Sequence, residues 1–337
     1  MEENSDRKVY LVATDDGYAQ VKLVGQNPNG VGLVKMLVRS SVRPGRYGMS
    51  TLSGARAMGS YSTEEGEDYT VSDDVEGEST MFDGFHVSPL NRVLVNHALV
   101  AGGYGGHQVG LVAGLPVGDF FIDGALDQDK IVAKTRNLSK AITSASGAPM
   151  ADIVQVKIGC QAIAAFVDYL LDDDLVARDV ATKRVAVVDI GGRTTDIAVI
   201  MNRDSLDASK SGTSNIGVLD VYEMVARGIR AKFKTRDKYT LSDMDRAVRS
   251  GSFPMWGEPH DVSDLVAEAV REQETKIERE VSRRIGAASN VDVVLFVGGG
   301  AALFTRVSEP FRNGKVAPDP EFANARGLLK YMMNFSK

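Results

Sequence analysis

The sequence contains very little that would suit a secreted or membrane-embedded protein. Its 337 residues include one cysteine, Cys160, which excludes a disulfide framework within the chain and favours a reducing compartment. The first residues, Met1–Lys8, are charged and lack the apolar core of a signal peptide. No stretch approaches the roughly 20 apolar residues that span a bilayer. We therefore expect a cytoplasmic protein with no membrane segment.

Positive charge is also scarce. The chain carries 39 Lys and Arg against 45 Asp and Glu, and the net charge of −6 argues against broad binding to nucleic acid. The sequence lacks a Gly-x-x-x-x-Gly-Lys-Ser/Thr run, so a Walker-type phosphate loop is not supported. The length is too great for one ordinary core and fits two domains of about 150 residues each. Any contact with DNA is therefore expected to be local or to go through a basic partner.

One strand–turn–strand arrangement occurs once in each half of the chain. An apolar strand at 9–13 ends in an Asp-Asp-Gly turn and resumes at 21–24, and a strand at 184–189 ends in an Asp-Ile-Gly-Gly turn and resumes at 197–201. Such a repeat indicates two related halves. Further strands are expected at 109–115, 153–158 and 291–297, between helices at 91–101, 161–171, 218–233, 261–288 and 323–334. This alternation predicts an α/β fold with largely buried sheets.

Two polar stretches give weaker signals. The acidic residues at 64–78 predict an exposed hairpin or loop, because runs of charge are more often solvated than catalytic. Residues 128–142 are mixed and polar, and they favour no single element.

The two Asp-Gly turns predict a site for phosphate and metal. A tight turn presents several backbone N–H groups to one point, and glycine allows a phosphate to approach closely. Asp15 or Asp16 and Asp189 cannot bind phosphate, but they could hold Mg²⁺ through water, and Lys22 could neutralise phosphate charge. One such turn alone is as often only a hairpin turn, but two in matching contexts favour the binding interpretation.

Two further positions are weaker candidates. A run of three glycines, 298–300, follows a buried strand and would let a flat ligand lie against bare backbone, before a helix whose N-terminus favours anions. The simpler alternative is a strand-to-helix turn. Gln161 stands where a strand gives way to a helix, where its amide could orient a water molecule or merely cap the helix.

Taken in order, these segments resemble the actin/Hsp70/sugar-kinase superfamily. Residues 15–22 resemble its first phosphate loop and 189–197 its second, while 296–301 resemble its adenosine motif and 214–218 the segment near ribose and adenine. Within the superfamily the chain is most similar to the ParM (StbA) family of actin-like plasmid-segregation proteins. That similarity is carried by the Val-Asn-His-Ala-Leu-Val helix at 95–100 and by a strand ending in Leu-Pro at 116.

The resemblance implies a fold, a ligand and a set of residues. The fold is actin-like, with two related ribonuclease-H-like domains around a nucleotide cleft. Domain I comprises residues 1–180, with the last helix, about 320–337, packing back on it, and domain II comprises 181–319. The ligands are ATP or ADP, with GTP left open, and Mg²⁺. The implied nucleotide contacts are Asp15, Gly17, Tyr18, Ala19, Gln20, Lys22, Gly191, Gly192, Arg193, Thr194, Asn215, Gly217, Gly298, Gly299, Gly300 and Ala301.

The resemblance also implies how ATP would be hydrolysed. Asp15, Asp16 and Asp189 would hold the metal, mainly through water, and Gln161, Asp189 and Asp16 would serve catalysis. The family carries Glu where this chain has Gln161, so hydrolysis would depend on positioning and on Mg²⁺ rather than on a carboxylate base. Tyr18 and Arg193 also depart from the residues usual at the phosphate end.

The implied function is an ATPase that forms head-to-tail filaments. The filament would segregate plasmid DNA through a DNA-binding adaptor of the ParR type at a centromere-like site, with no direct DNA binding. A chromosomal or phage cytoskeletal filament protein is the alternative. A small-molecule kinase of the superfamily is a further alternative, but it would need a carboxylate base beside a substrate hydroxyl, and the sequence shows no clear candidate.

Overall fold

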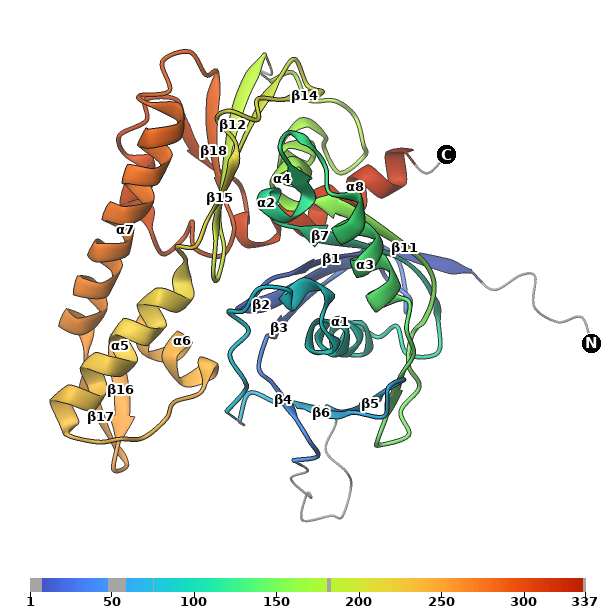
Figure 1. Cartoon of the computed structure of the whole chain (residues 1–337), viewed down its shortest axis with the longest axis vertical. Helices are drawn as coiled ribbons and strands as arrows, with labels where there is room; N and C mark the ends of the chain where they lie inside the picture. The colour runs from blue at the N-terminus through green and yellow to red at the C-terminus, as the bar shows by residue number, and fades with distance from the viewer. Residues whose placement is uncertain (1–7, 48–58, 75, 181–182, 336–337) are drawn as a thin grey trace, which may run out of the picture.

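The computed structural model describes residues 8–47, 59–74, 76–180 and 183–335. The molecule has two α/β halves that lie side by side, and each is built around its own central sheet (Figure 1). The first sheet has the order β11 (Asp152–Cys160), β7 (Gln108–Leu115), β1 (Val9–Asp16), β2 (Gln20–Gln26) and β3 (Leu33–Arg39). Strand β1 runs parallel to β7 and antiparallel to β2, so the first predicted strand–turn–strand arrangement lies at the centre of this sheet.

The second sheet repeats this plan. Its order is β14 (Ser205–Leu206), β13 (Thr195–Met201), β12 (Arg184–Ile190), β18 (Val293–Val297) and β19 (Gly314–Val316), with β15 (Gly212–Ser214) pairing with β13. Strand β12 runs antiparallel to β13 and parallel to β18. The second predicted arrangement is therefore also central, and the predicted α/β class is confirmed.

Helices cover both faces of the first sheet. Helix α1 (Pro89–Ala101) packs on one face, and α8 (Ala323–Phe335) packs on the other together with α4 (Gln161–Leu170). Side chains alternate along a strand, so Val12 joins the α1 side while Ala13 joins the α8 side. This alternation decides which aspartate of the first turn faces the second half.

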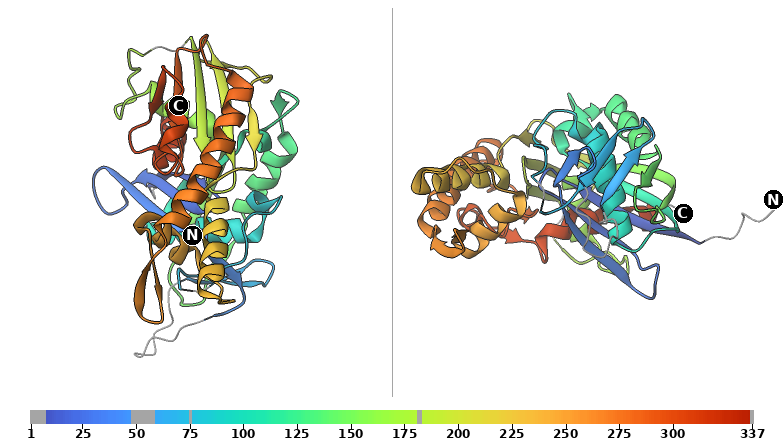
Figure 2. Two further views of the ribbon diagram at one scale, coloured as in Figure 1. Left: turned by 90° about the vertical axis from the view of Figure 1, so that its left-hand side faces the viewer. Right: turned by 90° about the horizontal axis from the view of Figure 1, so that it is seen from below.

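Smaller elements extend both halves. A four-stranded sheet lies beyond α1 in the order β10 (Ile142–Ser144), β5 (Ser60–Thr63), β6 (Asp68–Val71) and β4 (Val42–Pro44). The second half carries α5 (Val218–Phe233), α6 (Leu241–Ser250), the hairpin β16 (Ser252–Met255) and β17 (Glu258–Asp261), and α7 (Ser263–Ile285). The hairpin lies near one end of the long axis (Figure 2).

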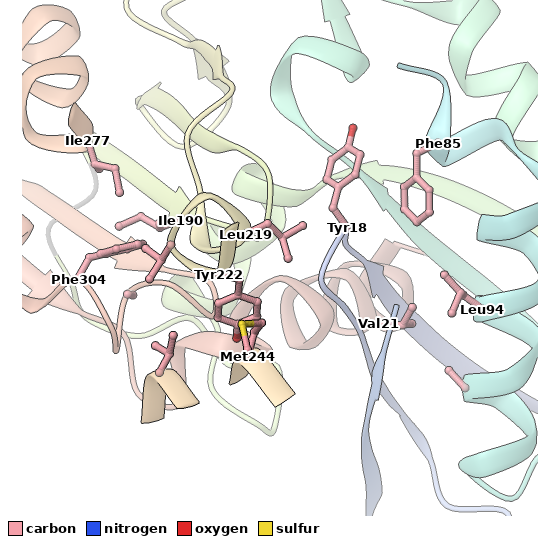
Figure 3. Close-up of a cluster of buried hydrophobic side chains, with 14 of the residues drawn as sticks. Tyr18, Val21, Phe85, Leu94, Ile190, Leu219, Tyr222, Met244, Ile277 and Phe304 are labelled. Carbon is pink, nitrogen blue, oxygen red and sulfur yellow. The ribbon is translucent and has the colours of Figure 1, made fainter. Parts of the chain in front are cut away.

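One apolar cluster runs through both halves (Figure 3). Tyr18 and Phe85 belong to its first part, and Leu219 and Tyr222 of α5 belong to its second part. None of the described helices is both long enough and apolar enough to cross a membrane.

Several predicted elements need correction. Residues 128–138 form helix α3 (Gln128–Leu138), and neither α6 nor the β16–β17 hairpin was expected from the sequence. The acidic stretch forms the β5–β6 hairpin, as predicted, but Glu65 at its turn pairs with the buried Arg92 and with Lys140, so its charge is not simply solvated. The boundaries of the two domains stay a prediction.

Candidate functional site

Two turns from the two sheets form the core of the candidate site. In the first, the amide of Gly17 donates to the carbonyl of Gln20 over 3.0 Å, and in the second Gly191 donates to Thr194 over 2.8 Å. Asp15 and Asp16 are the last two paired residues of β1 before the first turn, and Asp189 and Ile190 are the last two of β12 before the second. Asp15 is therefore equivalent to Asp189, and Asp16 to Ile190. The repeat seen in the sequence is therefore also a repeat of backbone geometry.

The tips of the two turns touch. A Cβ placed on Gly192 would lie 2.6 Å from the Cβ of Ala19, and one on Gly217 would lie 2.3 Å from the carbonyl oxygen of Gly192. Among the described residues, the amides of Tyr18, Ala19, Gly192 and Arg193 donate to no protein atom. Unpaired backbone amides in adjacent turns can bind phosphate oxygens.

A small pocket lies between the turns. The lining residues are Asp15, Gly17, Tyr18, Lys22, His86, Pro116, Gln161, Asp189, Gly191, Gly192, Thr194, Gly298 and Asn324. Its free volume is about 20 Å³, which is room for about one water molecule. The turns must therefore separate before a nucleotide phosphate chain can enter.

The first carboxylate of the pocket is Asp15, at the end of β1. The ammonium group of Lys22 lies 3.5 Å from Asp15 Oδ2, opposite it on β2, and the amide of Gln161 donates to Asp15 Oδ1 over 2.7 Å. All three side chains are buried. Gln161 opens α4 beside Gly114, where any Cβ would lie 2.6 Å from the Gln161 side chain. The structure thus brings together three of the predicted site residues.

The second carboxylate is Asp189, at the end of β12. Burial, and then the nearby carboxylates of Asp15 and Asp196, raise the pKa of Asp189 to about 7, although a hydrogen bond opposes the shift. In that bond the amide of Asn324 donates to Asp189 Oδ2 over 2.8 Å. Gly298, at φ 86°, closes the other side, because a Cβ there would lie 2.3 Å from Asp189 Oδ1. Asp189 therefore lies in a tightly enclosed, electronegative position.

Asp16 lies outside the pocket, on the α1 side of the sheet. Lys134 of α3 donates to Asp16 Oδ2 over 2.6 Å and Asn91 donates over 2.7 Å, while His86 Nδ1 lies 3.7 Å away. Burial alone would raise the pKa of Asp16, but Lys134 and His86 outweigh it and hold the pKa below its ordinary value. Asp16 is thus an ionised carboxylate buried against a lysine, and the structure does not bring it together with Asp15 and Asp189.

The two unusual residues at the phosphate end meet across the turns. The guanidinium of Arg193 lies 5.2 Å from the centre of the Tyr18 ring and donates to Asp83 Oδ1 over 2.8 Å. Tyr18 also packs against Phe85, with ring centres 5.1 Å apart. Burial first, and then Asp119, raises the pKa of Tyr18 to about 12, so its hydroxyl stays protonated. Arg193 of the second turn therefore bridges to Tyr18 and Asp83 of the first half.

Of the residues expected near adenosine, only Gly298 lines the pocket, although Gly217 packs against Gly192 of the second turn. The segment after β18 forms a turn and then a 3₁₀ helix at Thr305–Ser308, where the sequence suggested a helix N-terminus. Gly300 donates to the carbonyl of Ile190, and Asn215 is exposed before α5. Gly299 and Ala301 lie in the same turn as Gly300. The backbone carbonyls of Gln20 and Thr194 accept the hydrogen bonds that close the two turns.

Sequence reasoning missed three residues of this region. Asn324 and His86 line the pocket, and Asp196 accepts hydrogen bonds from Thr194, Thr213 and the amide of Val117. Burial, above all, raises the pKa of Asp196 to about 6. Its place opposite Asp189 follows from the hairpin register and could have been found, whereas nothing in the sequence marks Asn324.

The pocket suits a divalent cation held through water. Among the described residues no three acidic, histidine or cysteine side chains converge closely enough to bind a metal by themselves. Asp15 and Asp189 nevertheless line one buried pocket, and their mutual repulsion contributes to the raised pKa of Asp189. A hydrated Mg²⁺ would relieve that repulsion and would need few direct protein ligands. These residues therefore fit the metal that the turns predict.

The paired turns between two related sheets define the class to which the chain belongs, that of the actin-like proteins. Residues 10–171 match the family model of the plasmid segregation protein ParM, N-terminal, and residues 187–309 match that of the archaeal actin homologue MreB-like, C-terminal. The chain therefore has an actin-like fold and is similar to ParM in its first half and to the archaeal MreB-like homologue in its second. A search of curated proteins gave no match.

Solved structures agree on the fold. A 15-stranded ParM filament from Clostridium botulinum is 18 % identical, with a TM-score of 0.74 over 97 % of this chain and 100 % of that one. An archaeal actin homologue in complex with ADP is 21 % identical, with the same TM-score and the same coverage. Bacillus thuringiensis ParM with AMPPNP is 12 % identical, with a TM-score of 0.67 over 98 % of this chain and 100 % of that one. At these identities the likeness concerns the fold alone.

Proposed function

We propose that this chain binds ATP with Mg²⁺ between its two turns, hydrolyses it, and assembles into filaments that segregate plasmid DNA in the cytoplasm. The observation that carries the proposal is the matched pair of turns, which places the buried carboxylates of Asp15 and Asp189 in one pocket. The family match and the nucleotide complexes of two structural neighbours support the choice of ligand. GTP in place of ATP is an outcome that the binding assay below decides.

The residues of the pocket suggest a division of roles. The free amides of the two turns would hold phosphate oxygens, and Lys22 would add a positive charge. Asp15 and Asp189 would hold the water shell of Mg²⁺, which when bound neutralises charge on the phosphates. Gln161 would position the attacking water once its bond to Asp15 loosens. We assign Asp16 to the stability of the first turn instead, because it faces Lys134.

The proposed domains follow the two sheets. We place residues 1–180 in the first domain and 181–319 in the second, with the segment from about 320 onward returning to the first. This is supported by helix α8, whose Leu328 and Met332 pack against Ala13 and Val112 of the first sheet. The nucleotide would close the halves, because its phosphates contact both turns.

The test combines assembly and turnover. Negative-stain microscopy and light scattering with ATP, with GTP, with ADP and without nucleotide should show filaments with the triphosphate, and phosphate release should accompany them. Asp189→Asn should lose turnover, while Asp204→Asn, which changes an exposed aspartate elsewhere in the second half, should keep it. Wild-type protein that stays monomeric with every nucleotide at high concentration would refute the filament function.

A chromosomal or phage cytoskeletal filament is the second candidate. It is favoured by the match of residues 187–309 to an archaeal MreB-like model. The two candidates differ in their partners, because only plasmid segregation requires an adaptor of the ParR type that binds a centromere-like site. Deleting the gene should raise the loss rate of a low-copy plasmid that carries it. Unchanged plasmid retention together with altered cell organisation would favour the cytoskeletal role.

A further inference from the structure

Trp256 is displayed at the tip of the β16–β17 hairpin. Its side chain is 76 % exposed, which is unusual for the largest apolar residue. Phe233 and His260 support it in edge-to-face contacts, with ring centres 5.9 and 6.2 Å away. The indole is thus fixed on an aromatic base while most of its surface faces outward.

The turn that holds Trp256 is poorly suited to tryptophan. Trp256 and Gly257 form a two-residue hairpin turn with φ of 51° and 84°, between the paired residues Met255 and Glu258. Turns of this kind favour Asn-Gly, because bulky residues rarely adopt positive φ. Strained residues of this sort cluster at functional sites. The tryptophan is therefore costly for the turn itself, and most of its side chain is left exposed for contact with another molecule.

A pocket of matching character lies toward the other end of the molecule. It has a volume of about 420 Å³. On one side lie α2 (Val117–Phe120) and the hairpin of β8 (Phe121–Ile122) and β9 (Ala125–Leu126), and on the other lies the segment 206–212. Val117, Phe121 and Leu206 give it apolar walls. The elements α2 and β14 that border it lie toward the end of the long axis opposite β16–β17 (Figure 1 and Figure 2). A volume of this size accommodates a large aromatic side chain.

The charges around the two features are complementary. Residues 230–238, beside the hairpin, contain five basic side chains and one acidic one, and the hairpin itself adds Glu258 and Asp261, which leaves a net positive charge. Residues 117–130, at the pocket, contain four aspartates and one lysine, Lys130, which pairs with Asp119. Residues 203–210 contain two aspartates and two basic residues, so the rim of the pocket keeps a net negative charge. Opposite charges around an apolar contact steer encounter and fix its register.

We propose that Trp256 of one molecule inserts into the pocket between α2 and residues 206–212 of the next copy. This inference rests on the proposed filament function and names its longitudinal contact. The exposed Trp256 side chain, here called the knob, and the pocket lie at opposite ends of one chain. Their contact is head-to-tail, so it repeats without closing and builds a filament. The positive charge around the knob meets the negative charge around the pocket in each repeat.

The experiment uses Trp256 as its own reporter, because it is the only tryptophan in the sequence. Emission spectra of the wild-type protein are recorded with ATP while light scattering follows assembly. Burial of the indole in the pocket of the next copy should shift the emission to shorter wavelength in step with scattering. Assembly with no shift in emission would overturn the inference and leave the proposed function standing. An absence of assembly would overturn both.

Two variants remove the knob and the pocket separately. Trp256→Asn gives the turn the residue it favours, so thermal stability should be kept or raised while the critical concentration rises at least roughly tenfold. Ala208→Phe fills the pocket from an exposed position on its wall, and should have the same effect on assembly. Val31→Ala removes another fully exposed apolar side chain, on the β2–β3 turn, and should assemble like the wild type.

Mixing the two variants gives the decisive result. Trp256→Asn keeps an intact pocket and Ala208→Phe keeps an intact knob, so an equimolar mixture can form one correct contact but cannot repeat it. Sedimentation should show dimers with blue-shifted emission and no filaments. Filaments formed by Trp256→Asn alone at the wild-type critical concentration would overturn the proposal.

Discussion

The two turns of the site share a backbone but differ in the charge opposite their central aspartate. In the first turn Asp15 faces Lys22 across the hairpin, and in the second Asp189 faces Asp196. The first carboxylate therefore has its own counter-charge, whereas burial first, and then the like charges of Asp15 and Asp196, raises the pKa of the second to about 7. The two halves are alike in geometry and unlike in electrostatics.

This difference shows what each half contributes to the site. The first half brings a positive charge for phosphate, and the second brings an excess of negative charge that a cation would relieve. Neither half alone has both. A complete site for a metal–phosphate ligand therefore exists only where the two turns meet.

Asp189→Asn is the largest change that the comparison suggests. The substitution removes the carboxylate of the second turn. We expect ATP turnover to fall by at least about 1,000-fold, because the water molecules around the metal lose the carboxylate that holds them. The amide keeps the volume of the carboxylate, so the nucleotide-free protein should fold normally. Phosphate release and circular dichroism measure the two quantities. Turnover within a few-fold of wild type would contradict the site.

Lys134→Met tests the other face of the first turn. It leaves the buried Asp16 without its lysine, and we expect unfolding free energy to fall by about 3–5 kcal/mol. Lys130→Met, on the same helix, breaks a partly exposed pair with Asp119 and should cost less than about 1 kcal/mol. Urea titrations compare the two variants.

The second turn indicates how that loss could be reversed. Its equivalent of Asp16 is Ile190, which is apolar and fully buried. The double variant Asp16→Leu with Lys134→Met copies that solution and should recover much of the stability. A double variant no more stable than Lys134→Met would argue against the equivalence of the two positions.

Gln161→Ala probes positioning at the first carboxylate. Removing the amide that contacts Asp15 should lower turnover by roughly 10- to 100-fold with little change in nucleotide affinity. Single-turnover hydrolysis and equilibrium binding separate the two effects. Equal losses in both would assign Gln161 to binding alone.

The pH dependence of stability should reflect the raised pKa of Asp189 in the second half. The pKa of Asp189 is raised from 3.8 to about 7 in the folded protein, so its contribution to stability is fully present below about pH 4 and is lost as pH rises through 7. Urea unfolding of metal-free protein at pH 5 and pH 8 should show this loss in the wild type. In Asp189→Asn it should be reduced, and an identical pH response in the two proteins would contradict the shift.

Arg193→Thr should have the smallest effect. Its partner Asp83 is almost fully exposed, so stability should change by less than about 1 kcal/mol. Nucleotide release should become faster by a few-fold, because the side chain bridges the two halves. Stopped-flow release of a fluorescent nucleotide measures this rate. A slower release would indicate that Arg193 obstructs closure instead.

The central strands and turns could be predicted because their signals are local. The apolar runs, the Asp-Gly turns and the long helices α5 and α7 all lie within short windows of sequence. Helix α3 was missed because its sequence is mostly polar, and one of its buried residues is a lysine, Lys134, which cannot be told from its exposed charged neighbours. The β16–β17 hairpin was missed because tryptophan stands where asparagine would have marked the turn.

The site could be predicted only in part. Alternation along β1 requires Asp15 and Asp16 to face opposite sides, but it does not say which side faces the second sheet. That choice depends on where α8 packs, more than 300 residues later in the sequence. Asn324 likewise reaches Asp189 only through this distant contact. The part of the site that could not be predicted is therefore set by long-range packing, which leaves no local pattern in the sequence.

The return of α8 to the first sheet has a consequence for synthesis on the ribosome. Gly327 packs so closely on α4 that an added Cβ would collide with the backbone at Ala164, and Leu328 and Met332 cover Ala13 and Val112. Domains usually fold in the order in which they are made. Here one face of the first sheet is covered only in part, by α4, until the last helix emerges, so the half that is made first is completed last.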